Sequence, residues 1–165
     1  MSVMEKYSRI TPFLWFDGNA EEAVDFYCGV FKNARRLNEL RMTTDGGPVP
    51  KGGALTIAFE LDGQKFTALN GGPMFKFTEA VSFVVRCETQ AEVDEYWAKL
   101  TAGGGTEGQC GWLKDRFGLS WQVVPARIGE LIKSPKAMQA MMGMKKLVIA
   151  ELEGREGRGV GHQAE

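Results

Sequence analysis

Few side chains in this chain of 165 residues are suited to nucleophilic or acid–base chemistry. The cysteines are Cys28, Cys87 and Cys110, and the single histidine is His162, near the C-terminus. A reactive thiolate needs a base close to it, and the sequence offers no clear base for any of the three. We therefore expect Cys28 and Cys87 to be small buried or edge residues. Cys110 lies in a glycine-bracketed stretch and is a candidate for lining a pocket.

A second group with chemical potential is the charged run Lys114-Asp115-Arg116, at a predicted turn. Such a run is typical of a solvated hairpin tip. The alternative is that Lys114 or Arg116 meets an anionic ligand at the mouth of a pocket. No pair of residues is spaced as a convincing general acid and base.

Composition narrows the classes of function further. The net charge of −1 provides no field for holding a polyanion, and no apolar run approaches the roughly 20 residues needed to span a bilayer. The first residues lack the apolar centre of a signal peptide. An odd number of widely spaced cysteines indicates free thiols. We expect a cytoplasmic protein that binds neither nucleic acid nor membrane.

One sequence pattern occurs twice. Asn19 stands three residues before Glu22, and Thr89 stands three residues before Glu92. This spacing predicts a capping box, in which the two side chains satisfy backbone donors at the start of a helix. Each copy follows an apolar run and continues with one apolar stripe. The chain is therefore predicted to contain two matching strand-to-helix modules, as expected from internal duplication.

Apolar alternation and turn residues predict the remaining elements. The first half is expected to contain strands over residues 10–16, 35–42, 54–61 and 66–70 and a helix over 20–31. The second half is expected to contain strands over 81–87, 106–109, 112–115 and 119–124 and a helix over 90–102. The fold class is thus α+β, with two βαβββ modules over residues 8–72 and 78–126 that form cupped mixed sheets.

Residues 127–153 depart from this order and predict a helical extension. Ser134-Pro135 is a typical helix start, and Gly143 divides the stretch. The methionines at positions 138–144 are expected to act as a lid, or to pack on a partner or on the protein's own sheet. Residues 154–165 have no pattern and are expected to form a disordered tail.

Several segments carry a family resemblance, and together they cover most of residues 8–126. They are residues 16–23, 26–27 with 30–31, 69–73, 93–97, and the tryptophan-rich block 110–125. With the double βαβββ order, they resemble the PhnB-like branch of the vicinal oxygen chelate superfamily, which contains glyoxalase I, bleomycin resistance proteins and extradiol dioxygenases. Members of this branch carry the label 3-demethylubiquinone-9 3-methyltransferase. The resemblance also implies a homodimer.

The resemblance implies where a metal ion would be held. Catalytic members of the superfamily use His or Glu on the first and last strands of each module. Counted onto this chain, those positions fall on Pro12, Thr67, Ser82 and Gln122. Proline has no donor atom, and neutral hydroxyl or amide oxygens hold transition metals poorly. We therefore expect neither a metal site nor a cofactor. A glycine-rich loop that opens a helix, as a methyltransferase cofactor needs, is also missing.

Without a metal, the cup remains as a pocket of aromatic and neutral polar side chains. The candidates for its lining are Pro12, Thr67, Leu69, Ser82, Cys110, Trp112 and Gln122. Strand alternation places Trp121 opposite Gln122 and therefore beneath the helices, and Trp97 lies on a helix stripe and belongs to the core.

Three hypotheses for function follow. The first is a metal-free protein that binds a small, partly aromatic or apolar compound. The second is an enzyme of the same superfamily, either a glyoxalase-type lyase or isomerase or a methyltransferase, with Cys110 as the least poor catalytic candidate. The third is a scaffold whose own side chains fill the cavity.

Overall fold

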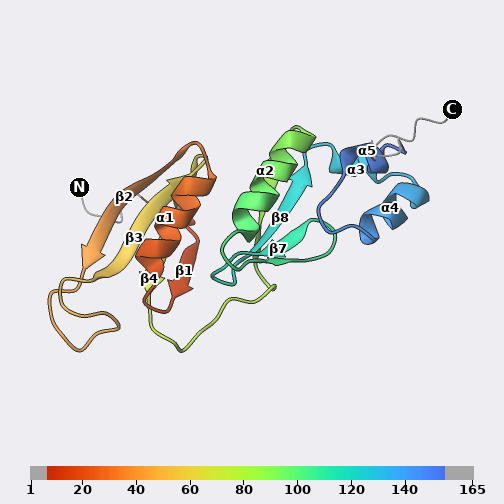
Figure 1. The fold of residues 1–165 in the computed structure, drawn as a ribbon. Helices are drawn as coiled ribbons and strands as arrows, with labels where there is room; N and C mark the ends of the chain where they lie inside the picture. The colour runs from red at the N-terminus through yellow and green to blue at the C-terminus, as the bar shows by residue number, and fades with distance from the viewer. Residues whose placement is uncertain (1–6, 155–165) are drawn as a thin grey trace. The chain divides into compact units, whose positions relative to one another are not determined.

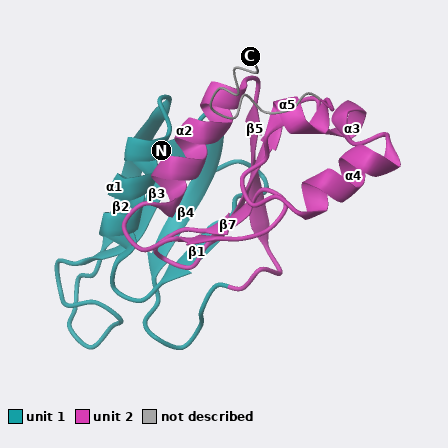
Figure 2. Ribbon diagram, turned by 45° about the vertical axis from the view of Figure 1, so that its right-hand side comes forward, with its two compact units in different colours: residues 1–77 teal, residues 78–165 magenta. Residues whose placement is uncertain are grey.

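The computed structural model describes residues 7–154, which fall into two compact units divided between Phe77 and Thr78 (Figures 1 and 2). The predicted disordered tail over 154–165, with His162, lies outside the described residues except for Gly154. None of the helices within 7–154 is long and apolar enough to cross a membrane.

The first unit contains a four-stranded sheet with one helix. Its elements are β1 (Phe13–Phe16), α1 (Ala20–Val30), β2 (Ala34–Arg41), β3 (Ala54–Leu61) and β4 (Gln64–Asn70). The strand order is β1-β4-β3-β2. The outer strand β1 is parallel to β4, and the other pairs are antiparallel. The sheet is mixed because the helical crossover returns the chain parallel to its first strand, whereas β2, β3 and β4 follow one another by reversals.

The second unit repeats this order. Its elements are β5 (Ser82–Cys87), α2 (Gln90–Thr101), β6 (Thr106–Glu107), β7 (Trp112–Lys114) and β8 (Ser120–Pro125). The strand order is β5-β8-β7-β6, with β5 parallel to β8. The predicted α+β class with two βαβββ modules is confirmed. A helical extension follows, with α3 (Ile128–Leu131), α4 (Pro135–Met142) and α5 (Ile149–Leu152).

Strand alternation gives each sheet one face beneath its helix and one face without a helix. In the first unit the ring of Tyr27 on α1 stacks on Phe59 of β3, and Phe59 stacks on Phe66 of β4. Leu14 and Phe16 of β1 are buried on the same side. We call the opposite side the helix-free face. In the first unit it carries Phe13, Trp15, Asn38, Leu40, Thr56, Ala58, Thr67 and Leu69.

The core of the second unit lies between α2 and the sheet. Trp97 is buried, and its indole donates to Glu107 Oε1 at 2.6 Å. Trp121 is also buried, beneath the helix. The core positions predicted for both tryptophans are confirmed. By the same alternation, the helix-free face of this unit carries Ser82, Val84, Arg86, Thr106, Trp112, Lys114, Ser120, Gln122 and Val124.

The extension has a small core of its own. Met144, Leu147 and Leu152 are buried together, with the side chains of α3 and α4 packed around them. Ser134 caps α4 as predicted, since its hydroxyl accepts from the Ala137 N–H at 3.0 Å. Gly143 ends α4. Of the predicted methionine stretch, Met144 therefore packs inside the extension, while Met138 and Met142 are exposed.

Backbone and amide hydrogen bonds hold the extension to the second sheet. The Cys110 and Gly111 N–H groups donate to the carbonyls of Met144 and Lys145, each at 2.8 Å. Gln90, the first residue of α2, donates to the Leu147 carbonyl at 3.0 Å and accepts from the Ile149 N–H at 2.8 Å. The side-chain amide of Gln90 thus satisfies the Leu147 carbonyl and the Ile149 N–H, at the start of α5.

Candidate functional site

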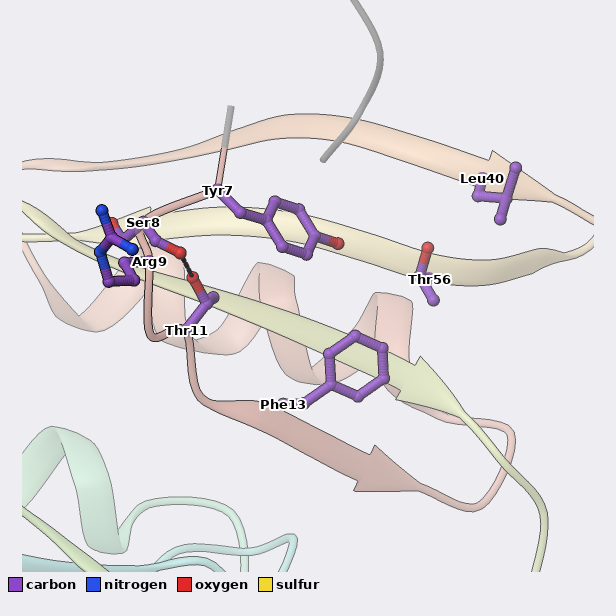
Figure 3. Close-up of a pocket in the computed structure, with 7 residues that line it drawn as sticks. All are labelled: Tyr7, Ser8, Arg9, Thr11, Phe13, Leu40 and Thr56. Atoms are coloured by element: carbon purple, nitrogen blue, oxygen red, sulfur yellow. Dashed lines mark hydrogen bonds between the residues drawn. The ribbon is translucent and has the colours of Figure 1, made fainter. Parts of the chain in front are cut away.

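The helix-free face of the first unit forms a cavity of about 650 Å³. Its lining residues are Tyr7, Ser8, Arg9, Thr11, Phe13, Leu40 and Thr56. In Figure 3 the rings of Tyr7 and Phe13 lie over the strands and point toward the space that Leu40 and Thr56 border. Phe13 is 52% exposed and Leu40 is 51% exposed, so both offer apolar surface to a ligand. An apolar cavity with a few polar groups is the usual form of a small-molecule site.

Two neutral polar atoms lie deeper on the same face. Thr67 is fully buried, and Asn38 is half-buried. Both are in register with Ala58, from the strands on either side of it. Within residues 7–154, Thr67 Oγ1 and Asn38 Oδ1 are buried without a hydrogen-bond partner. A buried polar atom without a partner is costly and uncommon, so these two atoms have hydrogen-bonding capacity left for a bound molecule or water.

The second unit has its own, smaller cavity, of about 330 Å³. Its lining residues are Glu79, Thr106, Glu107, Gly108, Trp112, Leu113, Lys114 and Ser120. Lys114 forms an ion pair with Glu79. Of the seven predicted lining residues, Trp112 belongs to this cavity. Ser120, which the sequence did not single out, is fully buried at its edge, and its Oγ is a further polar atom without a partner in the described chain.

Ser82 and Gln122, two of the positions that the sequence resemblance assigns to metal ligands, bond to each other here. The Gln122 Nε2 donates to Ser82 Oγ at 3.0 Å. Thr67 at the third position is a buried neutral hydroxyl. In the part of the chain that the structure describes, no three His, Cys, Asp or Glu side chains lie close enough together to hold a metal ion. The donors present at these positions therefore do not fit a divalent transition metal.

Pro12, at the fourth counted position, does not line the cavity of the first unit. It lies before β1, and its carbonyl accepts from the Thr67 N–H at 2.9 Å. Its neighbours Thr11 and Phe13 line that cavity instead. The reason is alternation along the chain, because Leu14 and Phe16 point to the helix side and the odd-numbered residues point away.

Leu69 and Cys110 lie at other places. Leu69 is on the helix-free face of β4, paired with Trp15 and Thr56. Trp15 packs on the backbone of the segment after β4, since its indole donates to the Gly72 carbonyl at 2.8 Å. Cys110 lies outside the strands at a φ of 58° and holds the extension through its backbone.

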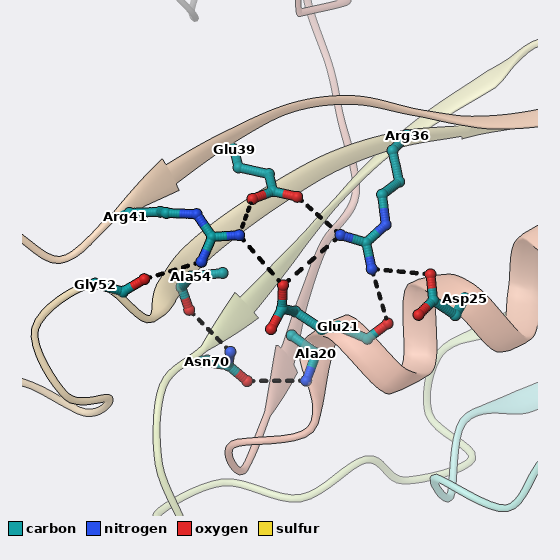
Figure 4. Close-up of polar contacts among 9 residues, drawn as sticks. All are labelled: Ala20, Glu21, Asp25, Arg36, Glu39, Arg41, Gly52, Ala54 and Asn70. Atoms are coloured by element: carbon teal, nitrogen blue, oxygen red, sulfur yellow. Dashed lines mark hydrogen bonds and ion pairs between the residues drawn. The ribbon is translucent and has the colours of Figure 1, made fainter.

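A charged network joins α1 to the edge strand β2 in the first unit (Figure 4). Arg36 pairs with Asp25 and Glu39 at 2.8 Å each, and Arg41 reaches Glu39 and Glu21. The two arginines face three carboxylates that they largely neutralise. Exposed pairs of this kind contribute little each, so the network adds only modestly to the contact between β2 and α1.

The start of α1 is not capped as predicted. Asn19 makes no capping hydrogen bond with its side chain. The Ala20 N–H instead donates to Asn70 Oδ1 at 2.9 Å, from the end of β4 (Figure 4). At α2, the Thr89 hydroxyl accepts from the Glu92 N–H at 3.2 Å as predicted, but the Glu92 carboxylate accepts from Glu88 rather than from Thr89.

The interpretation of residues 114–116 as a solvated tip is wrong for Asp115. This residue is 3% exposed. Its carboxylate accepts from the N–H groups of Phe117 and Leu119 and from the Trp121 indole, at 2.9–3.1 Å. Asp115 therefore fixes the turn between β7 and β8. Arg116 is exposed over the ring of Phe117.

Comparisons with known proteins agree with this architecture. The model of the family described as 3-demethylubiquinone-9 3-methyltransferase matches residues 8–124. A Bacillus cereus protein, described as a PhnB protein and a 3-demethylubiquinone-9 3-methyltransferase, is 34% identical. The alignment covers 72% of this chain and 100% of that one, with a TM-score of 0.65.

More distant structures share the fold. Protein PA1353 of Pseudomonas aeruginosa is 20% identical, with 72% and 98% of the two chains covered and a TM-score of 0.60. The fosfomycin resistance protein FosX of Listeria monocytogenes is 14% identical, with 78% and 99% covered and a TM-score of 0.57. No curated protein gave a significant match. The chain belongs to the 3-demethylubiquinone-9 3-methyltransferase family, the PhnB-like branch of the vicinal oxygen chelate superfamily.

Proposed function

We propose that this protein binds a small, partly apolar molecule without the help of a metal ion. The observation that carries the proposal is the cavity of about 650 Å³ on the helix-free face of the first unit, with Phe13 and Leu40 half-exposed in its wall. Half-exposed aromatic and aliphatic side chains gain free energy when a ligand covers them. The cavity size lies within the range of about 300–1,000 Å³ that is usual for ligand sites.

The proposal does not include a metal ion, because the side chains at the positions that the resemblance assigns to metal ligands are poor donors. A structure of the FosX protein contains Mn(II) and sulfate, so this fold is able to accommodate a metal ion. In the present chain Ser82 and Gln122 satisfy each other, and Thr67 offers only a hydroxyl. A ligand in the cavity of the first unit would be held by apolar contact and hydrogen bonds, with Arg9 as the one charged lining residue.

A thermal-shift screen of small molecules, performed on the full chain with and without Mn²⁺, Zn²⁺ or Ni²⁺, tests the proposal. A ligand at 100 times its Kd stabilises the native state by about 2.7 kcal/mol, which corresponds to a rise in Tm of roughly 5–10 °C. We expect such a rise without added metal. Phe13→Ala should reduce the rise, while Met74→Ala, which removes an exposed side chain outside the cavity, should leave it unchanged.

Two outcomes would contradict the proposal. Stoichiometric metal in elemental analysis of the purified protein, or ligand shifts that need added metal, would indicate the metal-dependent enzyme of the superfamily. If no compound raises Tm above that of the protein alone, in the wild-type chain or in Phe13→Ala, the helix-free face of the first unit is covered by the protein itself.

We also propose that the protein is a cytoplasmic homodimer that binds neither nucleic acid nor membrane. The family resemblance supports the dimer, and the net charge of −1 argues against nucleic acid. Light scattering of the eluted protein should give twice the mass of 18.2 kDa. A mass of one chain at micromolar concentration would contradict the dimer.

A further inference from the structure

We propose that the cavity of the first unit selects a small carboxylate with an apolar body. This inference rests on the proposed function, because it assigns a chemical class of ligand to the same cavity. It adds a charge and an orientation for the ligand, with the carboxylate at Arg9 and the apolar body between Phe13 and Leu40, all three of which line the cavity.

Arg9 is the one charged side chain in the lining of this cavity. It is exposed, and within residues 7–154 it forms no ion pair. By contrast, Arg36 and Arg41 in the network around α1 each pair with Glu21 and Glu39. The positive charge of Arg9 is therefore not cancelled by a carboxylate of the described chain, and it is accessible to a ligand.

The strand register places further positive charge on the same face of the sheet. Glu60 of β3 lies opposite Arg35 of β2 and Lys65 of β4, in one row across the sheet. Alternation from Ala58 and Thr67 puts this row on the helix-free face. The row contains two cations and one carboxylate, with Arg35 Nε at 3.2 Å from Glu60 Oε2. One positive unit remains, and its field favours an anion over a cation at this end of the face.

The cavity has a charged end and an apolar end. In Figure 3, Arg9 lies at the end where β1 and β4 begin, and Leu40 lies at the other end, beyond the ring of Phe13. Along β4, the row of Lys65 and the row that contains Leu69 and Leu40 are four residues apart, which is about 13 Å in an extended strand. A ligand that reaches both ends must therefore be elongated.

The chemistry of the two ends defines the ligand. The planar guanidinium of Arg9 offers parallel N–H donors that match the two oxygens of a carboxylate. At the other end Phe13 and Leu40 are about half-exposed, and they gain free energy when an apolar body covers them. A neutral molecule would use only the apolar end, and an ammonium ion would be repelled at the charged one.

Calorimetric titration of the full chain with octanoate, octanol and octylammonium tests the inference. The three probes share an apolar chain and differ in charge. We expect octanoate to bind about fivefold more tightly than octanol, which is the size of effect that one exposed ion pair supplies. Octylammonium should bind more weakly than octanol.

Two substitutions separate the contact with the carboxylate from the contact with the apolar body. Arg9→Gln should weaken octanoate about fivefold and leave octanol unchanged, whereas Phe13→Ala should weaken both probes to the same extent. Arg9→Lys keeps the charge and loses the parallel donors, so it should give an intermediate affinity for octanoate. Lys133→Gln removes one positive charge from an exposed residue of the second unit and should change none of these affinities.

The other outcomes overturn the inference. Octylammonium that binds as tightly as octanoate would show that the cavity does not select an anion. Equal losses for Arg9→Gln and Lys133→Gln would assign the effect to the net charge of the protein instead of a contact with Arg9. If octanol binds as tightly as octanoate and both depend on Phe13, this inference fails while the proposed function stands. If no probe binds and no compound in the thermal-shift screen raises Tm, both fail.

Discussion

The side chain of Asn70 caps helix α1 from the end of β4, the strand next to β1. The Ala20 N–H donates to Asn70 Oδ1, and Asn70 Nδ2 donates to the Ala54 carbonyl, both at 2.9 Å (Figure 4). Asn70 is 3% exposed. One buried amide therefore joins the helix start, the end of β4 and the beginning of β3.

Replacing Asn70 by alanine should lower the free energy of unfolding by about 3 kcal/mol, because it removes a helix cap and leaves the Ala54 carbonyl buried without a donor. Urea denaturation measures the change. Asn19→Ala is the matched control, since Asn19 makes no side-chain cap, and it should cost less than about 0.5 kcal/mol. Equal losses for the two variants would show that Asn19 caps the helix in solution.

Asp115→Ala should destabilise the second unit by about 3 kcal/mol. The substitution leaves two backbone N–H groups and the Trp121 indole without their shared acceptor. Near-ultraviolet circular dichroism of the tryptophans and urea denaturation report the effect. Arg116→Ala, at the next residue, should cost less than about 1 kcal/mol, since Arg116 is exposed and its contact with the ring of Phe117 lies at the surface. An Asp115 variant as stable as Arg116→Ala would contradict the buried turn.

Gln90→Ala should loosen the extension without unfolding the sheet. Both hydrogen bonds to the backbone around Leu147 and Ile149 are lost, while the apolar core of the extension remains. Hydrogen exchange over residues 144–153 should accelerate severalfold. Gln109→Ala, which removes an exposed side chain of the same type, should not change it. Unchanged exchange in both variants would mean that apolar packing and the backbone bonds of Cys110 and Gly111 hold the extension without the Gln90 amide.

Stability should fall in mildly alkaline solution because of Cys87. Burial, with smaller contributions from Glu92 and Glu88, raises the pKa of this thiol from its usual value of 9.0 to about 12. Above pH 9 the unfolded chain loses this proton while the folded chain keeps it, so unfolding becomes more favourable as pH rises toward 12.

Urea denaturation at pH 9 and pH 10 measures this effect. Between these values the wild-type chain should lose about 1 kcal/mol more stability than Cys87→Ala, in which the titrating group is absent. Parallel pH dependence of the two proteins would show that the Cys87 thiol ionises in the folded state as readily as in the unfolded one.

Local signals in the sequence predicted most of the elements. Strand β3 was predicted at its observed bounds because an apolar run precedes the turn Asp62-Gly63. Helix α2 was predicted within one residue because Thr89 provides its cap from the adjacent position. Where the residues that define an element are neighbours in the chain, pattern and propensity are sufficient.

The predictions failed where a residue's partners lie far away in the chain, and where its burial does not follow from strand alternation. Asn70 caps a helix that begins 50 residues earlier, and no local motif announces it. Asp115 resembles a surface charge until its three donors are known. In the candidate sites, Trp112 was predicted. Tyr7 lies before the first predicted strand, and Thr11, although inside the strand predicted over residues 10–16, was not singled out. Ser120 is recognised only through its burial.

Gln122 and Ser82, which are joined by a hydrogen bond, make this part of the helix-free face of the second unit uncharged. Neither an amide nor a hydroxyl gains or loses a proton at any pH in which the protein stays folded. The contribution of this pair to holding a neutral molecule would therefore be the same in acidic and in neutral surroundings.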